Sequence, residues 1–341
     1  MLEKPALDEG RLAACLQADY GLAAVQLTFL PLGADLNTAV YRADSSAAPP
    51  RFVKLRRGAF NELAVALPRC LRDQGLDQVM APLATQAGRL WADLDPYTVS
   101  VYPFVDGQDG YAVPLSEAGW IELGRTLRRL HAADLPPALR ARLPREAYSP
   151  EWRRLVQRLL EHAAQAQAAP PDPVAAEAAA VLRDQREAIT ELVERAGRLA
   201  AVTQARAPAA TPCHADLHAG NLLIGADGAV FIVDWDEPLL APKERDLMYV
   251  GGGLMGGWRR PAEETALFYQ GYGTAPIDPA ALAYYRYERI IQDIAVIGRQ
   301  LLWSAAGGQD RAVHLGYLKS NFQPGGVLEI ARQAEGQQPA E

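Results

Sequence analysis

A short segment in the second half of the chain concentrates side chains that could do chemistry. It reads His214-Ala215-Asp216-Leu217-His218-Ala219-Gly220-Asn221, and an apolar run ending in Asp234 follows. Carboxylate and amide oxygens are the ligands that Mg²⁺ prefers, and a carboxylate on a loop can take a proton from a hydroxyl group. The segment therefore contains a candidate base, Asp216, and two candidate metal ligands, Asn221 and Asp234.

This set of residues suits phosphoryl transfer. The reaction requires an acceptor hydroxyl held in line, a carboxylate to receive its proton, and Mg²⁺ bridging the phosphates. An Asp followed five residues later by an Asn is also the spacing of the kinase catalytic loop. A loop with an Asx turn and a strand-ending Asp would explain each residue alone, but not the whole set with the strand that follows.

The two histidines of this segment permit another interpretation, a metal pair at positions i and i+4. A zinc protease needs H-E-x-x-H on a helix. Here Ala215 replaces the Glu, and Gly220 with the strand after it favours a loop. We therefore expect His214 to shape the loop through hydrogen bonds.

A second signal lies upstream, in a predicted strand. Lys54 alternates with apolar residues in Phe52-Val53-Lys54-Leu55, and a lysine inside an apolar strand is costly unless it is paired. Kinases use such a lysine to hold the α- and β-phosphates, with a helix Glu orienting it. Glu62, on the next predicted helix, is the candidate partner.

The segment between the first two predicted strands is where a phosphate-binding loop should lie. It has one glycine, Gly33, and not the G-x-G-x-x-G pattern. Its backbone N–H groups and the side chains of Asn37 or Thr38 could still meet phosphates.

The elements around these residues predict an α+β fold with two lobes. Short β-prone runs are expected as strands at residues 25–30, 38–42, 51–55 and 98–104, with Pro49-Pro50 as the turn before the third, and a helix at residues 61–70. From residue 107 the chain is mainly helical: Ser116 is a candidate N-cap, residues 169–173 are a breaker, an Ala-rich helix spans 174–200, and a hairpin spans 222–233. We expect a nucleotide-binding lobe at residues 1–104 and a helical lobe with catalytic loop and substrate cleft at 105–341.

Composition excludes several classes of protein. Hydrophobic residues make up 49% and charged residues 22%, which is typical of globular domains. The three cysteines are too few and too scattered for a disulfide framework or zinc site. Since the sequence has neither a signal-peptide core nor a membrane-spanning apolar run, we expect a cytoplasmic protein. The net charge of −7 argues against nucleic acid and suits a cationic small substrate, although mild acidity is ordinary.

Together, the motifs His214–Asn221 and Ile232-Val233-Asp234-Trp235 resemble those of the aminoglycoside phosphotransferase and choline kinase superfamily. The resemblance implies a protein-kinase-like fold, with Asp216 as catalytic base and Asn221 and Asp234 as Mg²⁺ ligands. It also implies ATP as cofactor, with Lys54 on its phosphates. The residues at the end of the first lobe, Tyr102 and Phe104 among them, would form the hinge that meets the adenine.

Further stretches in both predicted lobes resemble the spectinomycin phosphotransferase group of this superfamily; they are residues 33–37, 148–153, 234–238, 241–248, 251–253, 271–273, 284–286 and 288–290. This implies an aminocyclitol antibiotic as substrate, and resistance as the role. Its protonated amines would suit an acidic cleft. The candidate residues are the carboxylates Asp236, Asp246 and Glu288, with Trp258 as a ring wall.

Other functions fit the same motifs. A metabolic kinase for choline, homoserine or a sugar would share the catalytic loop, and activity on an antibiotic could be incidental to another natural substrate. A nucleotide-binding pseudokinase would be expected to lack Asp216, Asn221, Asp234 or Lys54, and all four are present. The sequence leaves the choice of ATP or GTP and the oligomeric state open.

Overall fold

The computed structural model describes residues 4–33, 37–165, 172–304, 308 and 310–336. The chain forms two compact units, each made of two segments. The first unit contains residues 1–144 and 214–239, and the second contains residues 145–213 and 240–341. The catalytic-loop residues His214–Asn221 therefore belong to the same unit as the strand that carries Lys54. The predicted lobe boundary after residue 104 stays a prediction.

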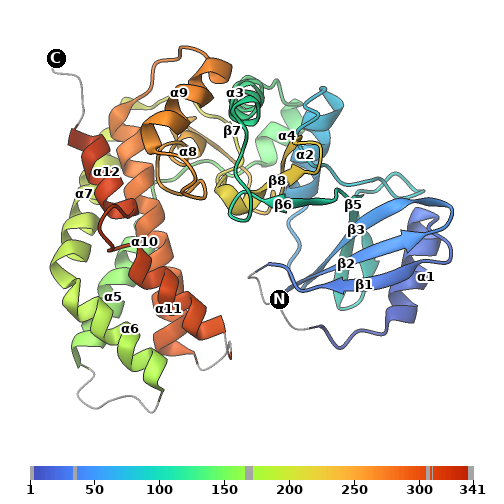
Figure 1. Cartoon of the computed structure of the whole chain (residues 1–341), viewed down its shortest axis with the longest axis horizontal. Helices are drawn as coiled ribbons and strands as arrows, with labels where there is room; N and C mark the ends of the chain where they lie inside the picture. The colour runs from blue at the N-terminus through green and yellow to red at the C-terminus, as the bar shows by residue number, and fades with distance from the viewer. Residues whose placement is uncertain (1–3, 34–36, 166–171, 305–307, 309, 337–341) are drawn as a thin grey trace. The chain divides into compact units, whose positions relative to one another are not determined.

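The first unit contains a five-stranded antiparallel sheet of order β1-β2-β3-β5-β4 (Figure 1). Its strands are β1 Gln26–Leu30, β2 Thr38–Ser45, β3 Ala48–Arg57, β4 Ala92–Leu94 and β5 Tyr97–Pro103. Val53 and Leu55 of β3 face a core shared with Leu12 and Leu16 of helix α1 (Glu9–Tyr20). Because side chains alternate along a strand, Lys54 points to the opposite face.

Two features of this sheet region differ from the sequence prediction. Helix α1 was missed, although Leu12, Cys15 and Leu16 have helical spacing and the Asp8 side chain caps the helix by accepting from Gly10 N at 2.8 Å. The expected turn at Pro49-Pro50 is also wrong, because β3 begins at Ala48 and includes both prolines. They lie beside a register shift between Ala43 and Ser45, where a strand tolerates residues without an N–H donor.

The rest of the first unit consists of helices and short strands, together with the catalytic loop. These are α2 Leu63–Asp73, β6 Gly107–Asp109, α3 Glu117–His131, α4 Pro137–Arg142, the 3₁₀ turn η1 Ala219–Asn221, β8 Leu222–Gly225 and β9 Val230–Ile232. Ser116 caps α3 as predicted, since its hydroxyl accepts from Gly119 N at 3.0 Å. Strands β8 and β9 form the predicted hairpin, which β6 extends to a sheet of order β6-β8-β9.

The second unit is built around the long helix α10 (Pro279–Trp303), which has helices α5, α7, α11 and α12 beside it (Figure 1). The other elements of this unit are α5 Glu151–Gln165, α6 Pro173–Asp184, α7 Arg186–Arg206, β7 Thr211–Cys213, β10 Leu239–Ala241, α8 Glu244–Leu247, α9 Pro261–Tyr272, α11 Asp310–Ser320 and α12 Val327–Gly336. The single Ala-rich helix predicted at 174–200 is two helices, α6 and α7, which meet at Gln185. Most of the predicted breaker at 169–173 lies outside the described residues.

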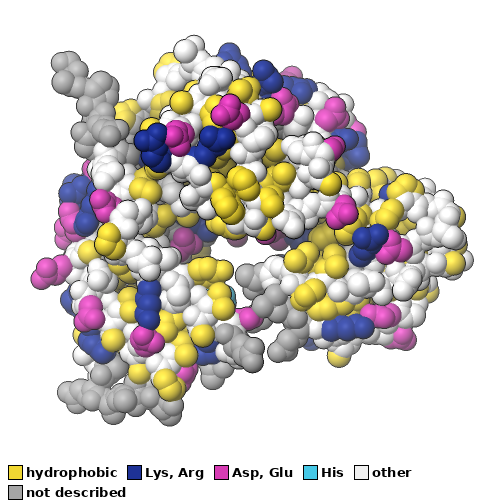
Figure 2. Space-filling model, in the orientation of Figure 1, with side chains coloured by type: hydrophobic (Ala, Val, Ile, Leu, Met, Phe, Trp, Pro, Cys, Tyr) yellow, Lys and Arg dark blue, Asp and Glu magenta, His cyan; other side chains and the backbone are white. Residues whose placement is uncertain are grey.

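The predicted α+β class is confirmed by this mixture of helices and antiparallel strands. Among the described residues, none of the helices is both long and apolar enough to cross a bilayer. On the face drawn in Figure 2, Lys and Arg side chains are interspersed with Asp and Glu side chains.

Candidate active site

His214 anchors the catalytic loop to the segment that carries Asp234. Its ring is buried, with Nε2 lying 2.9 Å from the carbonyl oxygen of Val233 and Nδ1 3.2 Å from the backbone nitrogen of Asp216. These partners require the tautomer in which Nε2–H donates to Val233 and Nδ1 accepts from Asp216. The ring also packs edge-on against Trp235, at 4.6 Å between centroids. His214 therefore has the loop-shaping contacts that its position in the sequence predicted.

Asp216 and Asn221 lie side by side across the turn of this loop. The Asn221 side-chain amide donates to the backbone carbonyl of Asp216 at 2.7 Å, and the same nitrogen is 3.4 Å from Asp216 Oδ2. The residue before the base, Ala215, has a φ of 74°, which costs energy for a residue with a Cβ. The surrounding hydrogen bonds hold this conformation, and so fix the direction of the Asp216 side chain.

His218 borders the same carboxylate on its other side. Its Nε2 atom is 3.6 Å from Asp216 Oδ2, and its ring stacks on Tyr111 with centroids 5.8 Å apart. His218 Nδ1 accepts a hydrogen bond from Gly220 N at 3.0 Å. The second histidine of the motif therefore caps the short turn η1.

Asp234 lies two residues after the end of strand β9, close to Asn221 in the fold. The backbone nitrogen of Val233 donates to the carbonyl oxygen of Asn221 at 3.0 Å, so the two candidate metal ligands sit on adjoining ends of the β8–β9 hairpin. Asp234 has a φ of 63°, the second strained position in the site. Strain of this kind is maintained where the direction of a side chain matters to function.

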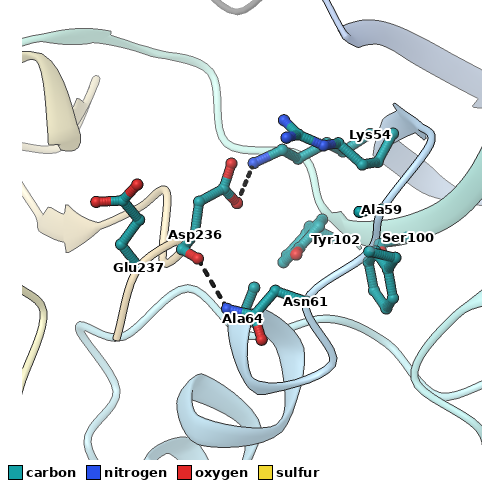
Figure 3. Close-up of a pocket in the computed structure, with 10 residues that line it drawn as sticks. Lys54, Ala59, Asn61, Ala64, Ser100, Tyr102, Asp236 and Glu237 are labelled. Carbon is teal, nitrogen blue, oxygen red and sulfur yellow. Dashed lines mark hydrogen bonds and ion pairs between the residues drawn. The ribbon is translucent and has the colours of Figure 1, made fainter. Parts of the chain in front are cut away.

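Lys54 reaches this site from strand β3. Its Nζ atom lies 2.7 Å from Asp234 Oδ1 and 2.7 Å from Asp236 Oδ1, and the second of these bonds is drawn in Figure 3. Burial favours a lower pKa for Lys54, but the two carboxylates outweigh it and raise the pKa. Burial favours a higher pKa for Asp234, and Lys54 outweighs it and lowers the pKa. Both groups are therefore charged at neutral pH.

The predicted pairing of Lys54 with Glu62 is not formed in this structure. Glu62 lies at the start of α2, about half exposed, and accepts from Arg142 of α4 at 2.6 Å. The carboxylate partners of Lys54 come instead from the segment after β9. Asn61, which the sequence analysis did not single out, links the start of α2 to this segment by donating to the carbonyl oxygen of Asp236 at 3.0 Å (Figure 3).

A pocket of about 200 Å³ opens beside Lys54. It is lined by Lys54, Arg56, Ala59, Phe60, Asn61, Ala64, Ser100, Tyr102, Asp236 and Glu237. Tyr102, a predicted hinge residue, lines it, and burial raises the pKa of its hydroxyl to about 12, so that the hydroxyl stays protonated. Phe104, the other predicted hinge residue, packs under the guanidinium of Arg42, with 4.5 Å between the guanidinium carbon and the ring centroid.

The predicted phosphate loop is described only at its ends. Gly33 has a φ of 85°, a conformation that favours glycine, and residues 34–36 lie outside the described residues. Asn37 is exposed, and its carbonyl oxygen accepts from the backbone nitrogen of Arg57 at 2.8 Å. Thr38 is buried, and its hydroxyl accepts from Arg56 at 3.1 Å. Arg56 is thus a second cation on the Lys54 side of the sheet that sequence reasoning missed.

The candidate substrate residues have different surroundings. Asp236 is in the first unit, bonded to Lys54. Glu288 and Asp246 are buried in the second unit; Glu288 lies 3.6 Å from Arg153, and burial raises its pKa to about 7. Asp246 has no exposed surface, so a direct substrate contact would require it to be uncovered. Trp258 is half exposed, as a side chain whose ring lines a substrate site would have to be.

The oxygen donors in the first unit fit a hard divalent cation. Asp234 supplies a carboxylate that Lys54 keeps ionised, and Asn221 supplies an amide oxygen whose NH₂ group is already directed at Asp216. Oxygen ligands of this kind, few in number and completed by phosphates, are typical of Mg²⁺ sites. The arrangement can therefore hold a metal–nucleotide complex next to the Asp216 carboxylate.

Comparison with known proteins places residues 28–285 in the phosphotransferase enzyme family. The fold is similar to the crystal structure of spectinomycin phosphotransferase APH(9)-Ia in complex with ADP and spectinomycin. The TM-score is 0.88 and the identity 34%, over 97% of this chain and 99% of that chain. The AMP-bound complex of that enzyme matches with a TM-score of 0.83 and 34% identity, over 95% of this chain and 98% of the other.

More distant matches include one protein sequence and one solved structure. The protein StrN of Streptomyces griseus is 25% identical over 289 residues, which is 83% of this chain and 82% of StrN. The solved structure of amicoumacin kinase has a TM-score of 0.59 at 17% identity, covering 98% of this chain and 95% of that chain. The predicted kinase-like fold is therefore confirmed.

Proposed function

The chain belongs to the phosphotransferase enzyme family, and on that premise we propose that it transfers the γ-phosphate of ATP to a hydroxyl group of an aminocyclitol antibiotic, most specifically spectinomycin. The observation that carries the proposal is the convergence of Lys54 and Asp234, which lie 180 residues apart in sequence and 2.7 Å apart in space. This ion pair brings the candidate phosphate-binding lysine of strand β3 together with a candidate metal ligand from the segment after β9, beside the pocket that Lys54 lines.

Each residue has a role in the proposed reaction. Asp216 takes the proton of the acceptor hydroxyl while the hydroxyl oxygen forms a bond to the γ-phosphorus. The bond between that phosphorus and the oxygen bridging to the β-phosphate breaks, and ADP leaves. Lys54 holds the remaining phosphates, and Asn221 with Asp234 holds Mg²⁺, which when bound neutralises charge on the phosphates.

The choice of acceptor is supported by two observations. The enzyme that shares 34% identity over nearly the whole of both chains was crystallised with spectinomycin. Spectinomycin also carries two secondary amines that are protonated near neutral pH, and these could form charge-assisted hydrogen bonds with carboxylates of the acceptor site. Such bonds are worth roughly 1.5–3 kcal/mol each, so they would favour aminocyclitols over neutral sugars.

An acceptor panel tests this proposal. Purified protein with ATP and Mg²⁺ is offered spectinomycin, kanamycin, choline and homoserine separately, and ADP release is followed. We expect the highest kcat/KM with spectinomycin. Release stimulated by choline or homoserine and not by spectinomycin would refute the antibiotic substrate and favour a metabolic kinase.

The proposed role is resistance, exerted in the cytoplasm, where ATP is available. Cells that express the wild-type chain should tolerate more spectinomycin than cells that express Asp216→Asn at the same level. Equal tolerance would show that phosphorylation of this antibiotic is incidental.

A further inference from the structure

Asp236 forms an ion pair with Lys54, the lysine for which the sequence predicts Glu62 as the partner. We propose that Asp236, held by Asn61, is the positioning residue for Lys54 in this chain, in place of a carboxylate on helix α2. The inference rests on the proposed use of Lys54 to bind the nucleotide phosphates. It assigns to Asp236 a function distinct from contact with the antibiotic.

The geometry around the ammonium group supports this assignment. Lys54 Nζ is 2.7 Å from one oxygen of Asp236 and 2.7 Å from one oxygen of Asp234, and both distances are in the range of charge-assisted hydrogen bonds. An ammonium group has three donors in total. The described residues accept two of them, and the third is available to a phosphate oxygen. Asp236 therefore fixes Lys54 without competing for that third donor.

Asn61 fixes Asp236 in turn. Its side-chain nitrogen donates to the backbone carbonyl of Asp236 at 3.0 Å (Figure 3). Its side-chain oxygen accepts from the backbone nitrogen of Leu63 at 3.1 Å. One side chain thus forms hydrogen bonds both with the first residue of α2 and with the segment after β9. Kinases commonly connect this helix to the lysine through a Glu, whereas here the connection runs through Asn61 and Asp236.

Glu62 is directed elsewhere. Its carboxylate bonds Arg142, and both side chains of that pair are about half exposed. Lys54, in contrast, has only 18% of its side chain exposed. Burial disfavours the charged form of an ammonium group, so Lys54 needs a second carboxylate in addition to Asp234. Asp236 meets that need inside the pocket.

A double-mutant cycle on ADP binding tests the inference, with Lys54→Met, Asp236→Asn and the double variant compared with wild type by calorimetry. Asp236→Asn should weaken ADP binding about ten- to a hundredfold, the range for one charge-assisted hydrogen bond. In the Lys54→Met background the same change should not weaken binding further, because Asp236 acts through Lys54. Asp73→Asn, which removes an exposed carboxylate of α2 bonded to Arg69, is the matched control and should bind like wild type.

Three further measurements separate this role from others. Asp236→Glu should restore part of the lost affinity, and Glu62→Gln should cost less than threefold, well below the loss expected for Asp236→Asn. The effect of Asp236→Asn should be the same in Mg²⁺ and in EDTA. The inference would be overturned if Asp236→Asn weakened ADP binding as much in the Lys54→Met background as in wild type. It would also be overturned if Asp236→Asn weakened ADP binding only in the presence of Mg²⁺. Because the readout is ADP binding, no acceptor is needed; failure of the proposed function would appear separately, as ADP-binding protein that phosphorylates none of the acceptors.

Discussion

Replacing Lys54 by Met should destabilise the protein by an amount that depends on pH. The change removes the cation that lies 2.7 Å from both Asp234 and Asp236 and leaves two carboxylates without it. The difference in stability between wild type and variant should be largest at neutral pH and should shrink in acid.

The direction follows from the pKa of Asp234, which the structure holds below its ordinary value through Lys54. A carboxylate with a lowered pKa stabilises the fold above the unfolded-state pKa of about 4, and this contribution is lost as pH falls through the lower, folded-state pKa. The pKa of Lys54 is raised, so the lysine's own contribution is complete throughout the acid and neutral range. The pH dependence therefore comes from Asp234.

The size of the effect follows from exposure. Two charge-assisted hydrogen bonds would contribute roughly 3–6 kcal/mol if fully buried. The Asp234 and Asp236 side chains are 50% and 42% exposed, so solvent screening reduces this to about 2 kcal/mol. For a compact unit of this size, that corresponds to a fall in Tm of about 4–8 °C near pH 7.

Thermal unfolding followed by circular dichroism between pH 3 and pH 8 would measure this difference. Arg69→Met is the control, because Arg69 and Asp73 form an exposed ion pair on α2, and its loss should change Tm by little at any pH. A Lys54→Met difference that stays constant across the range, or that widens in acid, would refute the reasoning.

Three further predictions concern single residues. Asp216→Asn should lower kcat by about 10²–10⁴-fold and leave ADP affinity unchanged, as measured by single-turnover kinetics and calorimetry; near-normal turnover would remove Asp216 as the base. Asp234→Ala should abolish Mg²⁺-dependent turnover, because one anionic ligand of the cation is lost, and a Mg²⁺ titration identical to that of wild type would make Asp234 purely structural. Glu264 is buried, accepts from Gly251 N at 3.0 Å, and has a pKa raised to about 7 by burial. Wild type should therefore lose up to about 3 kcal/mol of stability as pH rises from about 4.5 to 7. Glu264→Gln, which keeps an acceptor for Gly251, should lack this loss, and parallel stability curves for the two proteins would contradict the assignment.

The catalytic loop was predictable because its residues act over short distances in sequence. The contacts of His214 with Asp216 and Val233, and of Asn221 with Asp216, are made within a loop and the hairpin that follows it. The spacing of such residues fixes most of their geometry. The pairing of Lys54 with Asp234 joins distant segments, and it could be anticipated only from the chemistry that both serve.

The partners of long, flexible side chains were harder to predict. Glu62 lies at the start of the expected helix, yet it forms an ion pair with Arg142, and the segment after β9 supplies Asp236 as the second carboxylate for Lys54. Helix α1 was missed although its apolar residues have helical spacing, because a helix of 12 residues is marginal alone and depends on packing, here of Leu12 and Leu16 against the sheet. In both cases tertiary contacts, which local sequence does not encode, decided the outcome.

The central claim, phosphoryl transfer from ATP to a hydroxyl of spectinomycin, is tested most directly by the reaction product. The purified chain is incubated with ATP, Mg²⁺ and spectinomycin, and mass spectrometry with phosphorus NMR identifies what has formed. The account predicts spectinomycin heavier by one phosphoryl group, with a phosphate ester signal, in an amount equal to the ADP released. ADP formed without a phosphorylated antibiotic, or no ADP at all from a protein that binds the nucleotide, would contradict it.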